Sequence, residues 1–234
     1  MRRILISLSF VFALAGCGSG ADVNVLFVGN SFTHFHNMPG MVEEIAAANG
    51  VTVDTEMIAP GGALLSGHVN DPAVAEAIAS GDFDIVVFQE QSQAPAVGQM
   101  AAEQTRPAAR TLDRMAANAG VDVIWYQTWG HDRGFPEFGL GDYGAMQEAI
   151  NSTYDALWAE LGGDVARVGE AWSVARSDLS INLYDPDGYH PSPAGSYLAA
   201  LVLTDTIIEA PAEVAPAVGA VTEDTAQQLL DITN

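Results

Sequence analysis

Residues 23–36, VNVLFVGNSFTHFH, restrict the fold more than any other part of the chain. Five of the first six residues are apolar, which is the pattern of a strand buried on both faces of a parallel sheet. After a turn that contains Ser31, apolar residues return at helical spacing behind Pro39. We therefore expect a strand, a sharp turn and a helix. Ser31 then lies at the carboxyl end of the sheet, where open α/β folds bind ligands.

The rest of the chain repeats this alternation of strand and helix. Further strands are expected at residues 51–58, 83–88, 121–127 and 165–168, and helices at 71–80, 101–118, 146–161 and after Pro191. This pattern predicts one domain at residues 23–210, an α/β/α sandwich on a mostly parallel sheet of about five strands. Residues 211–221 have no amphipathic period, so we expect a surface tail at 211–234 that ends in a helix.

The N-terminus has the features of an export signal. Residues 1–16 combine two arginines with a short apolar stretch, and the sequence LAGC that ends at Cys17 resembles the lipobox of bacterial lipoproteins. The resemblance implies a lipidated Cys17, a tether at residues 17–22 and an anchor in the bacterial cell envelope that faces the periplasm or the exterior. An ordinary cleaved signal is the alternative. Since Cys17 is the only cysteine, an internal disulfide, a cysteine nucleophile and a thiolate metal site are excluded.

The charge of the chain excludes several kinds of partner. Its 30 acidic and 8 basic residues give a formal net charge of −22, and no lysine is present. Such a field repels nucleic acids and anionic membrane surfaces, so membrane contact is expected only through the lipid anchor. Solubility in salt is the simplest explanation of this charge.

The stretch YDPDGYHPSPAG at residues 184–195 holds the second group of informative residues. Asp187 precedes His190 by three residues, immediately before a helix that Ser192 would cap. A hydrolytic serine needs a general base, and the base needs a carboxylate that fixes its tautomer. His190 and Asp187 could serve Ser31 in these roles. The alternatives are that Ser31 only caps a helix and that the 184–195 stretch is a structural loop.

Taken together, GNSFT, the glycine turn at 60–62, the block QEQS at 89–92 and DGYHPSPAG resemble the SGNH hydrolase (GDSL-like) superfamily. The likeness is greatest to bacterial members with a GNS block and a QEQS block. The resemblance implies that Ser31 is the nucleophile, that His190 is the base and that Asp187 orients it. It also implies an oxyanion hole made of the Ser31 N–H, the N–H of Gly62 or Gly61 and a side-chain amide.

The third block departs from the family pattern. The family usually has Gly-x-Asn-Asp where this chain has Gln89-Glu90-Gln91-Ser92. Gln91 falls in the position of the asparagine, but its longer side chain requires a more distant backbone, so Gln89 is the other candidate for the oxyanion donor.

The resemblance implies a serine esterase that needs no metal and no organic cofactor. Its substrate would be a small-molecule or glycan ester, and we expect O-acetyl groups on a carbohydrate. Trp129 and His131 are candidate substrate-binding residues in a loop at 128–143, flanked by the aromatic residues Trp125, Phe135, Phe138 and Tyr143. His34 and His36 lack a further ligand for a metal, and His68 is expected in a loop. The alternatives are a non-catalytic ligand-binding or scaffold lipoprotein and an O-acyltransferase.

Overall fold

The computed structural model describes residues 21–234. The expected signal peptide at 1–16 and the expected lipidation site Cys17 lie outside the described residues, so both stay predictions. Within the described range, no helix is both long enough and apolar enough to cross a bilayer.

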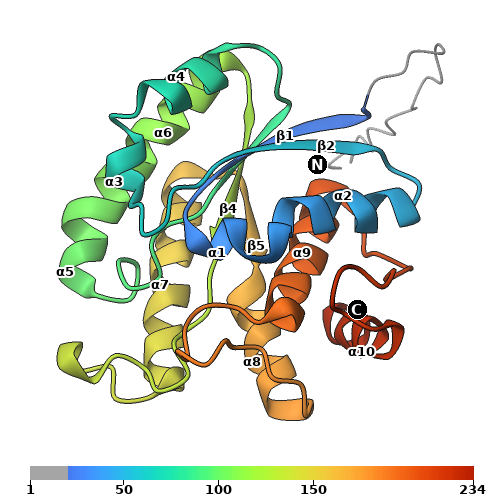
Figure 1. The fold of residues 1–234 in the computed structure, drawn as a ribbon. Helices are drawn as coiled ribbons and strands as arrows, with labels where there is room; N and C mark the ends of the chain where they lie inside the picture. The colour runs from blue at the N-terminus through green and yellow to red at the C-terminus, as the bar shows by residue number, and fades with distance from the viewer. Residues whose placement is uncertain (1–20) are drawn as a thin grey trace, which may run out of the picture.

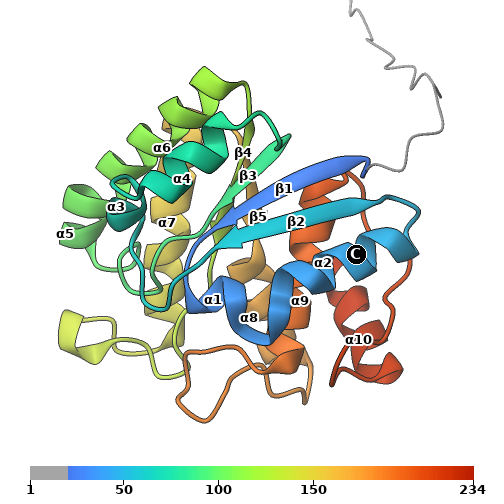
Figure 2. The same cartoon turned by 45° about the horizontal axis from the view of Figure 1, so that its top comes forward.

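One sheet of five parallel strands forms the centre of the described part of the chain, in the order β2-β1-β3-β4-β5 (Figures 1 and 2). The strands are β1 (Val23–Val28), β2 (Val53–Ile58), β3 (Ile85–Phe88), β4 (Asp122–Gln127) and β5 (Asp164–Arg167). This confirms the predicted α/β architecture. The winding reverses between β1 and β3, and such a reversal point opens a crevice at the carboxyl ends of the strands.

Helices cover both faces of the sheet (Figure 1). One layer contains α3 (Leu65–His68), α4 (Pro72–Ala79), α5 (Gly98–Met100), α6 (Arg106–Ala119) and α7 (Tyr143–Leu161). The other contains α2 (Met38–Ala48), α8 (Val168–Asp178), α9 (Pro193–Ile207) and α10 (Glu223–Thr233). The short elements are α1 (Ser31–His34), η1 (Phe35–Asn37), η2 (Ala101–Thr105) and η3 (Pro136–Phe138).

The continuous apolar run in β1 is explained by two separate cores. Val25 and Phe27 pack in the core under α2, α8, α9 and α10, whereas Leu26 and Val28 pack in the core under α4, α6 and α7. All four side chains are at most 1% exposed, as expected for a parallel strand covered on both faces.

The C-terminal segment at 211–221 is mostly exposed or half-buried, but three of its side chains are anchored in the core. Ala212, Val218 and Val221 are buried in the same core as α9. The hydroxyl of Tyr197, on α9, donates to the carbonyl of Pro216 at 2.7 Å. Residues that are buried from an irregular segment have no period, so the sequence pattern could not distinguish them from exposed ones.

The helix expected at 101–118 begins with a π-helical turn, η2, before α6. Pro107 explains the change, because a residue without an N–H cannot form the regular bond to the carbonyl four residues earlier. Helix α8 was not expected as a separate element and begins directly after β5.

Candidate active site

The turn after β1 presents Ser31 with its hydroxyl and its N–H unused by the helix cap. Asn30 is the N-cap of α1: its Oδ1 accepts the N–H of Phe32 at 3.1 Å, and its Nδ2 donates to the carbonyl of Ala63 at 2.9 Å. Ser31 is the first residue of the helix, where a backbone N–H has no partner within the helix. Ser31 is therefore not the cap, and both of its polar groups are available.

Two hydrogen bonds join Ser31, His190 and Asp187. Nε2 of His190 lies 2.9 Å from Oγ of Ser31, and Nδ1 of the same ring lies 2.7 Å from Oδ2 of Asp187. The ring of His190 stacks on Phe35 with the ring centroids 4.4 Å apart. The structure thus brings the three predicted side chains together in the order that proton transfer requires, while their catalytic roles stay predictions.

The surroundings of Asp187 keep its carboxyl ionised. Partial burial favours the neutral acid, but the N–H groups of Tyr189 and His190 and the His190 ring all donate to its oxygens and lower its pKa below the usual value. An ionised carboxylate at Nδ1 selects the tautomer in which Nε2 can accept a proton.

A pocket of about 430 Å³ opens beside the Ser31 hydroxyl. Gly61, Gly62, Gln91 and His190 line it together with Ser31. Within residues 21–234, neither glycine N–H donates a hydrogen bond, so both could bind an oxygen atom in the pocket. Gly62 has a φ of +73°, which glycine adopts without strain. The predicted glycine turn therefore reaches the pocket, and Gly61 and Gly62 both remain candidates.

Gln89 holds the turn after β1 and does not face the pocket, which corrects its place among the expected oxyanion donors. Its side chain is fully buried; Oε1 accepts the N–H of Asn30 and the hydroxyl of Thr33, each at 2.9 Å, and Nε2 donates to the carbonyl of Glu90. Gly29 allows this approach, because a Cβ there would lie 2.6 Å from Gln89 Oε1. The amide of Gln89 is committed to the turn.

Gln91 lies at the pocket with its amide held in one orientation. Its Oε1 accepts the N–H groups of Gln93 and Ala94 at 2.9 and 3.2 Å. Its Nε2 carries two hydrogens but makes one contact within the described residues, to Oγ of Ser92 at 3.3 Å, so one N–H is left for a ligand. Ser92 in turn lies 3.1 Å from Nε2 of His131, a contact that no sequence pattern indicates.

Glu90 connects the turns that follow β2 and β3. Its Oε1 accepts the N–H of Leu65 at 3.0 Å and the N–H of Gln91 at 2.7 Å. Burial raises the pKa of the Glu90 carboxyl, and the two N–H groups oppose that shift. Sequence reasoning missed this residue, because an acid between two glutamines resembles an ordinary polar turn. Its place directly after a buried strand was the only available signal.

Trp129 is part of the core, which corrects its expected role in binding substrate. Its indole stacks between Phe32, at a centroid distance of 4.5 Å, and Trp172, at 3.9 Å. Nε1 donates to the carbonyl of Tyr189 at 3.0 Å. Trp129 therefore supports α1 and the loop that carries His190 from within the protein.

Most of the aromatic side chains that flank the loop at 128–143 are used in packing. Trp125 is buried against Phe88, and the ring of Tyr143 lies under the guanidinium of Arg176 at 4.5 Å. Only Phe138 is largely exposed, at 54%. Local packing of a long loop therefore explains most of this group.

The remaining histidines make separate structural contacts. Nδ1 of His34 lies 2.7 Å from a backbone carbonyl after β2, and Nδ1 of His36 lies 3.0 Å from Oγ of Ser196. His68 was expected in a loop, but it ends α3, is 2% exposed, and its Nε2 donates to the carbonyl of Gly29 at 2.8 Å. Burial lowers the pKa of His68. Residues 21–234 contain no group of three or more histidine, cysteine or acidic side chains that could hold a metal ion.

A parallel sheet with a linked Ser, His and Asp at its carboxyl edge has the arrangement found in serine hydrolases. No family model matches the chain, and no curated protein does. Solved structures do. A protein from Slackia heliotrinireducens that is assigned to the SGNH hydrolases is 32% identical, with 79% of this chain and 98% of that chain covered and a TM-score of 0.68.

Two further structures show the same fold at lower identity. A DUF4886 family protein from Bacteroides uniformis is 17% identical, with 89% and 93% of the two chains covered and a TM-score of 0.73. An acetyl-xylooligosaccharide esterase from Geobacillus Stearmophilus is 14% identical, with 81% and 94% covered and a TM-score of 0.60.

The chain belongs to the SGNH hydrolases, because the Slackia protein is similar over almost its full length at 32% identity. Structural neighbours described as esterases and as a lipase/acylhydrolase share this fold at 12–16% identity.

Proposed function

We propose that the protein is a serine esterase with Ser31 as nucleophile, His190 as general base and Asp187 as the group that orients the base. The single observation that carries the proposal is the pair of hydrogen bonds, 2.9 Å and 2.7 Å, that places His190 between the other two side chains at the wall of a pocket.

In the proposed reaction, Oγ of Ser31 attacks the ester carbonyl while Nε2 of His190 takes the hydroxyl proton. The ionised Asp187 stabilises the imidazolium that results. His190 then protonates the leaving alcohol, and water activated by the same ring releases the acyl group from Ser31. All of these proton transfers use Nε2 of His190, while Nδ1 keeps its hydrogen bond to Asp187.

We assign the oxyanion hole to the N–H of Ser31, an N–H of the Gly61–Gly62 turn and Nε2 of Gln91. All three elements line the same pocket. Gln91 is preferred to Gln89 because its Nε2 has a hydrogen to spare, whereas the amide of Gln89 is buried and bonded at both ends. Donors fixed before the reaction cost no reorganisation when charge develops.

The proposed substrate class is an O-acetylated carbohydrate. An esterase of the same fold is described as acting on acetyl-xylooligosaccharide. The chain's negative charge disfavours anionic substrates, which agrees with a neutral glycan ester.

Hydrolysis of p-nitrophenyl acetate by the wild type and by Ser31→Ala tests the proposal. We expect at least a thousandfold loss of kcat in Ser31→Ala with unchanged circular dichroism, and labelling of the wild type alone by a fluorophosphonate. A folded wild type that neither releases acetate nor accepts the label would be a binding or scaffold protein. Acetyl transfer to an added sugar in preference to water would instead identify an acyltransferase.

We also propose that the protein is anchored in the cell envelope through a lipid on Cys17, as the LAGC sequence implies. Metabolic labelling with palmitate in a bacterial host should mark the wild type and not Cys17→Ala. Labelling of neither protein would leave an ordinary cleaved signal as the explanation.

A further inference from the structure

A second pocket, of about 500 Å³, borders the loop at residues 182–190 that carries Asp187 and His190. Asp187 and Gly188 contribute to its wall, while the next two residues, Tyr189 and His190, line the Ser31 pocket. The two pockets are therefore neighbours that share one short loop. The proposed mechanism gives no task to the second one.

Two loops form the walls of this second pocket, and they are tied to each other. The loop after β4 contributes residues 131–134, and the loop before α9 contributes residues around 182–188. The N–H of Asp132 donates to the carbonyl of Gly188 at 2.8 Å, which joins the loops directly. Figure 2 shows both loops at the end of the sheet where α1 lies.

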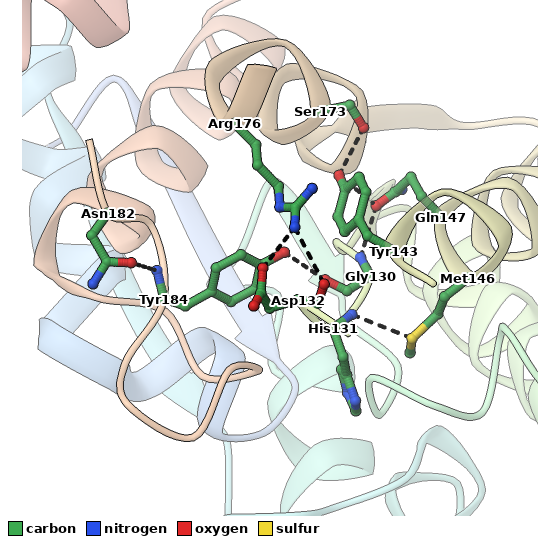
Figure 3. A network of polar contacts seen from close by, with 10 residues as sticks. All are labelled: Gly130, His131, Asp132, Tyr143, Met146, Gln147, Ser173, Arg176, Asn182 and Tyr184. Atoms are coloured by element: carbon green, nitrogen blue, oxygen red, sulfur yellow. Dashed lines mark hydrogen bonds and ion pairs between the residues drawn. The ribbon is translucent and has the colours of Figure 1, made fainter. Parts of the chain in front are cut away.

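A network of polar contacts fixes the walls from behind (Figure 3). The guanidinium of Arg176 donates to a carboxylate oxygen of Asp132 at 2.6 Å and to its carbonyl at 3.2 Å, and it lies over the ring of Tyr143. The hydroxyl of Tyr184 donates to the carbonyl of Gly130 at 2.7 Å. The pocket is thus held in shape before any ligand arrives, which lowers the entropic cost of binding.

The lining is polar and carries both donors and acceptors. Arg133 and Asn182 provide donors, and Asp132 and Asp185 provide acceptors, while large aliphatic side chains are missing from the lining. Arg133 makes no ion pair within the described residues. An acyl chain would find little apolar surface here. The lining has three carboxylates and one guanidinium, and among residues 21–234 only Asp132 is paired with a further cation, Arg176. The negative charge that remains disfavours an anionic group, so a neutral group with many hydroxyls fits best.

Two neighbouring aromatic rings line the two pockets, Tyr189 the Ser31 pocket and His131 the second one. Tyr189 is 37% exposed, and its ring lies 5.3 Å from the ring of His131, centroid to centroid. An exposed aromatic face is a suitable surface for the apolar face of a sugar ring. A glycan could therefore lie over Tyr189 with its ester at Ser31 and a neighbouring sugar in the second pocket.

We propose that the second pocket is a subsite for a neutral sugar residue of an oligosaccharide substrate, with Arg133 and Asp185 bonding its hydroxyls from opposite walls. This inference rests on the proposed function, since it assigns a place to the part of the substrate that does not react. Binding energy from such a remote part would raise kcat/KM for a glycan ester over that for an aryl ester.

The test uses the full chain and acetylated xylotetraose. We expect the double variant Arg133→Ala/Asp185→Ala to lower kcat/KM for this substrate about tenfold more than kcat/KM for p-nitrophenyl acetate, because two hydrogen-bonding side chains are lost. In the Ser31→Ala background, where turnover is absent, calorimetry should show the dissociation constant of the same oligosaccharide rise about tenfold. Arg114→Ala removes an exposed arginine from α6 and should change neither quantity.

The calorimetric measurement separates failure of the subsite from failure of the esterase. If the wild type hydrolyses p-nitrophenyl acetate but Ser31→Ala does not bind the oligosaccharide, or binds it equally with and without the double substitution, the subsite is disproved and the esterase stands. If Ser31→Ala binds and the double variant does not, while the wild type hydrolyses neither ester, the subsite stands and the esterase is disproved.

Discussion

The candidate active site has two halves that are built in different ways. The acid–base half consists of Ser31, His190 and Asp187, and two side-chain hydrogen bonds connect its members. The oxyanion half consists of the glycine turn after β2 and the block Gln89–Ser92 after β3. The four consecutive side chains of that block bind different partners. Gln89 binds the turn after β1, and Glu90 binds the segment after β2. Gln91 binds its own turn, and Ser92 contacts His131.

This difference indicates where changes should be tolerated. In the acid–base half, a substitution that keeps the Oδ1 acceptor of Asp187 removes a chemical role and leaves the backbone in place. In the oxyanion half, most side chains hold backbone turns, so a substitution is expected to act on stability unless it touches the donor itself. Activity and stability measured side by side can therefore test the division.

The largest effect is expected in the acid–base half, from Asp187→Asn. The amide can still accept N–H bonds at Oδ1, but its NH2 group would face Nδ1 of His190 and force the tautomer that cannot accept the Ser31 proton. We expect kcat for an aryl ester to fall about 10³- to 10⁴-fold with little change in Tm. Asp122→Asn, an exposed residue at the start of β4, is the control. A loss below tenfold would remove Asp187 from the mechanism.

A smaller effect is expected in the oxyanion half, from Gln91→Glu. The carboxylate keeps the acceptor used by the N–H groups of Gln93 and Ala94 but lacks the donor at Nε2. We expect kcat to fall about 10²- to 10³-fold at an unchanged Tm, the usual effect of losing one oxyanion donor.

Gln89→Ala is the matched comparison for Gln91→Glu. It would leave the N–H of Asn30 and the hydroxyl of Thr33 buried without an acceptor. Each unsatisfied group lowers the free energy of unfolding by about 1–3 kcal/mol, so the midpoint of urea unfolding should fall strongly. The opposite pattern, a stability loss in Gln91→Glu and a pure activity loss in Gln89→Ala, would exchange the roles of the two residues.

The same division explains what could be predicted from the sequence. The acid–base half was predictable because serine, histidine and aspartate have specific chemistry, and because a three-residue spacing keeps Asp187 beside His190. The choice between Gln89 and Gln91 was not, because it depends on how deeply each side chain is buried just past the end of β3. Alternation along the strand does not continue into a turn.

The fold was predicted from periodicity, and the errors occurred where periodicity is absent. The five strands and the helices with a clear apolar face were expected close to their observed bounds. Trp129 and the buried residues Ala212 and Val218 lie in irregular segments, where a buried residue and an exposed one have the same sequence signal. His68 illustrates the same limit, since α3 has only four residues.

The two carboxylate oxygens of Glu90 have different surroundings. Oε1 accepts two N–H groups, whereas Oε2 is buried with no hydrogen-bond partner within residues 21–234, near Thr105 and Tyr154. Burial raises the pKa of this carboxyl, so the folded state binds more protons than the unfolded state as pH rises above the unfolded value of about 4.3. Stability is therefore lost as pH rises through the folded pKa.

Glu90→Gln should remove this loss. Its amide keeps the acceptor for Leu65 and Gln91, carries no charge, and can donate to the hydroxyls of Thr105 or Tyr154, which also lack partners in the described part of the chain. We expect Glu90→Gln to be about 1–2 kcal/mol more stable than the wild type at pH 8 and equal to it near pH 4. Glu90→Ala, which loses the acceptor, should be less stable than both at either pH. A less stable Glu90→Gln at pH 8 would show that the charge itself holds the two turns.

The smallest effect is expected from His131, which reaches the oxyanion half only through Ser92. Burial lowers the pKa of His131 to about 4; the charge of Asp187 opposes this shift and that of His190 adds to it. The unfolded state takes up a proton on His131 near pH 6.5, whereas the folded state takes it up only near pH 4. The protein should therefore become less stable as pH falls from 6.5 toward 4. His131→Gln keeps a polar group near Ser92 and should lose less Tm over this range than the wild type, with kcat at pH 7 changed only a few-fold. If His131→Gln instead followed the wild-type curve, the ring would already be free to take up a proton in the folded protein, and its contact with Ser92 would not restrain the block that carries Gln91.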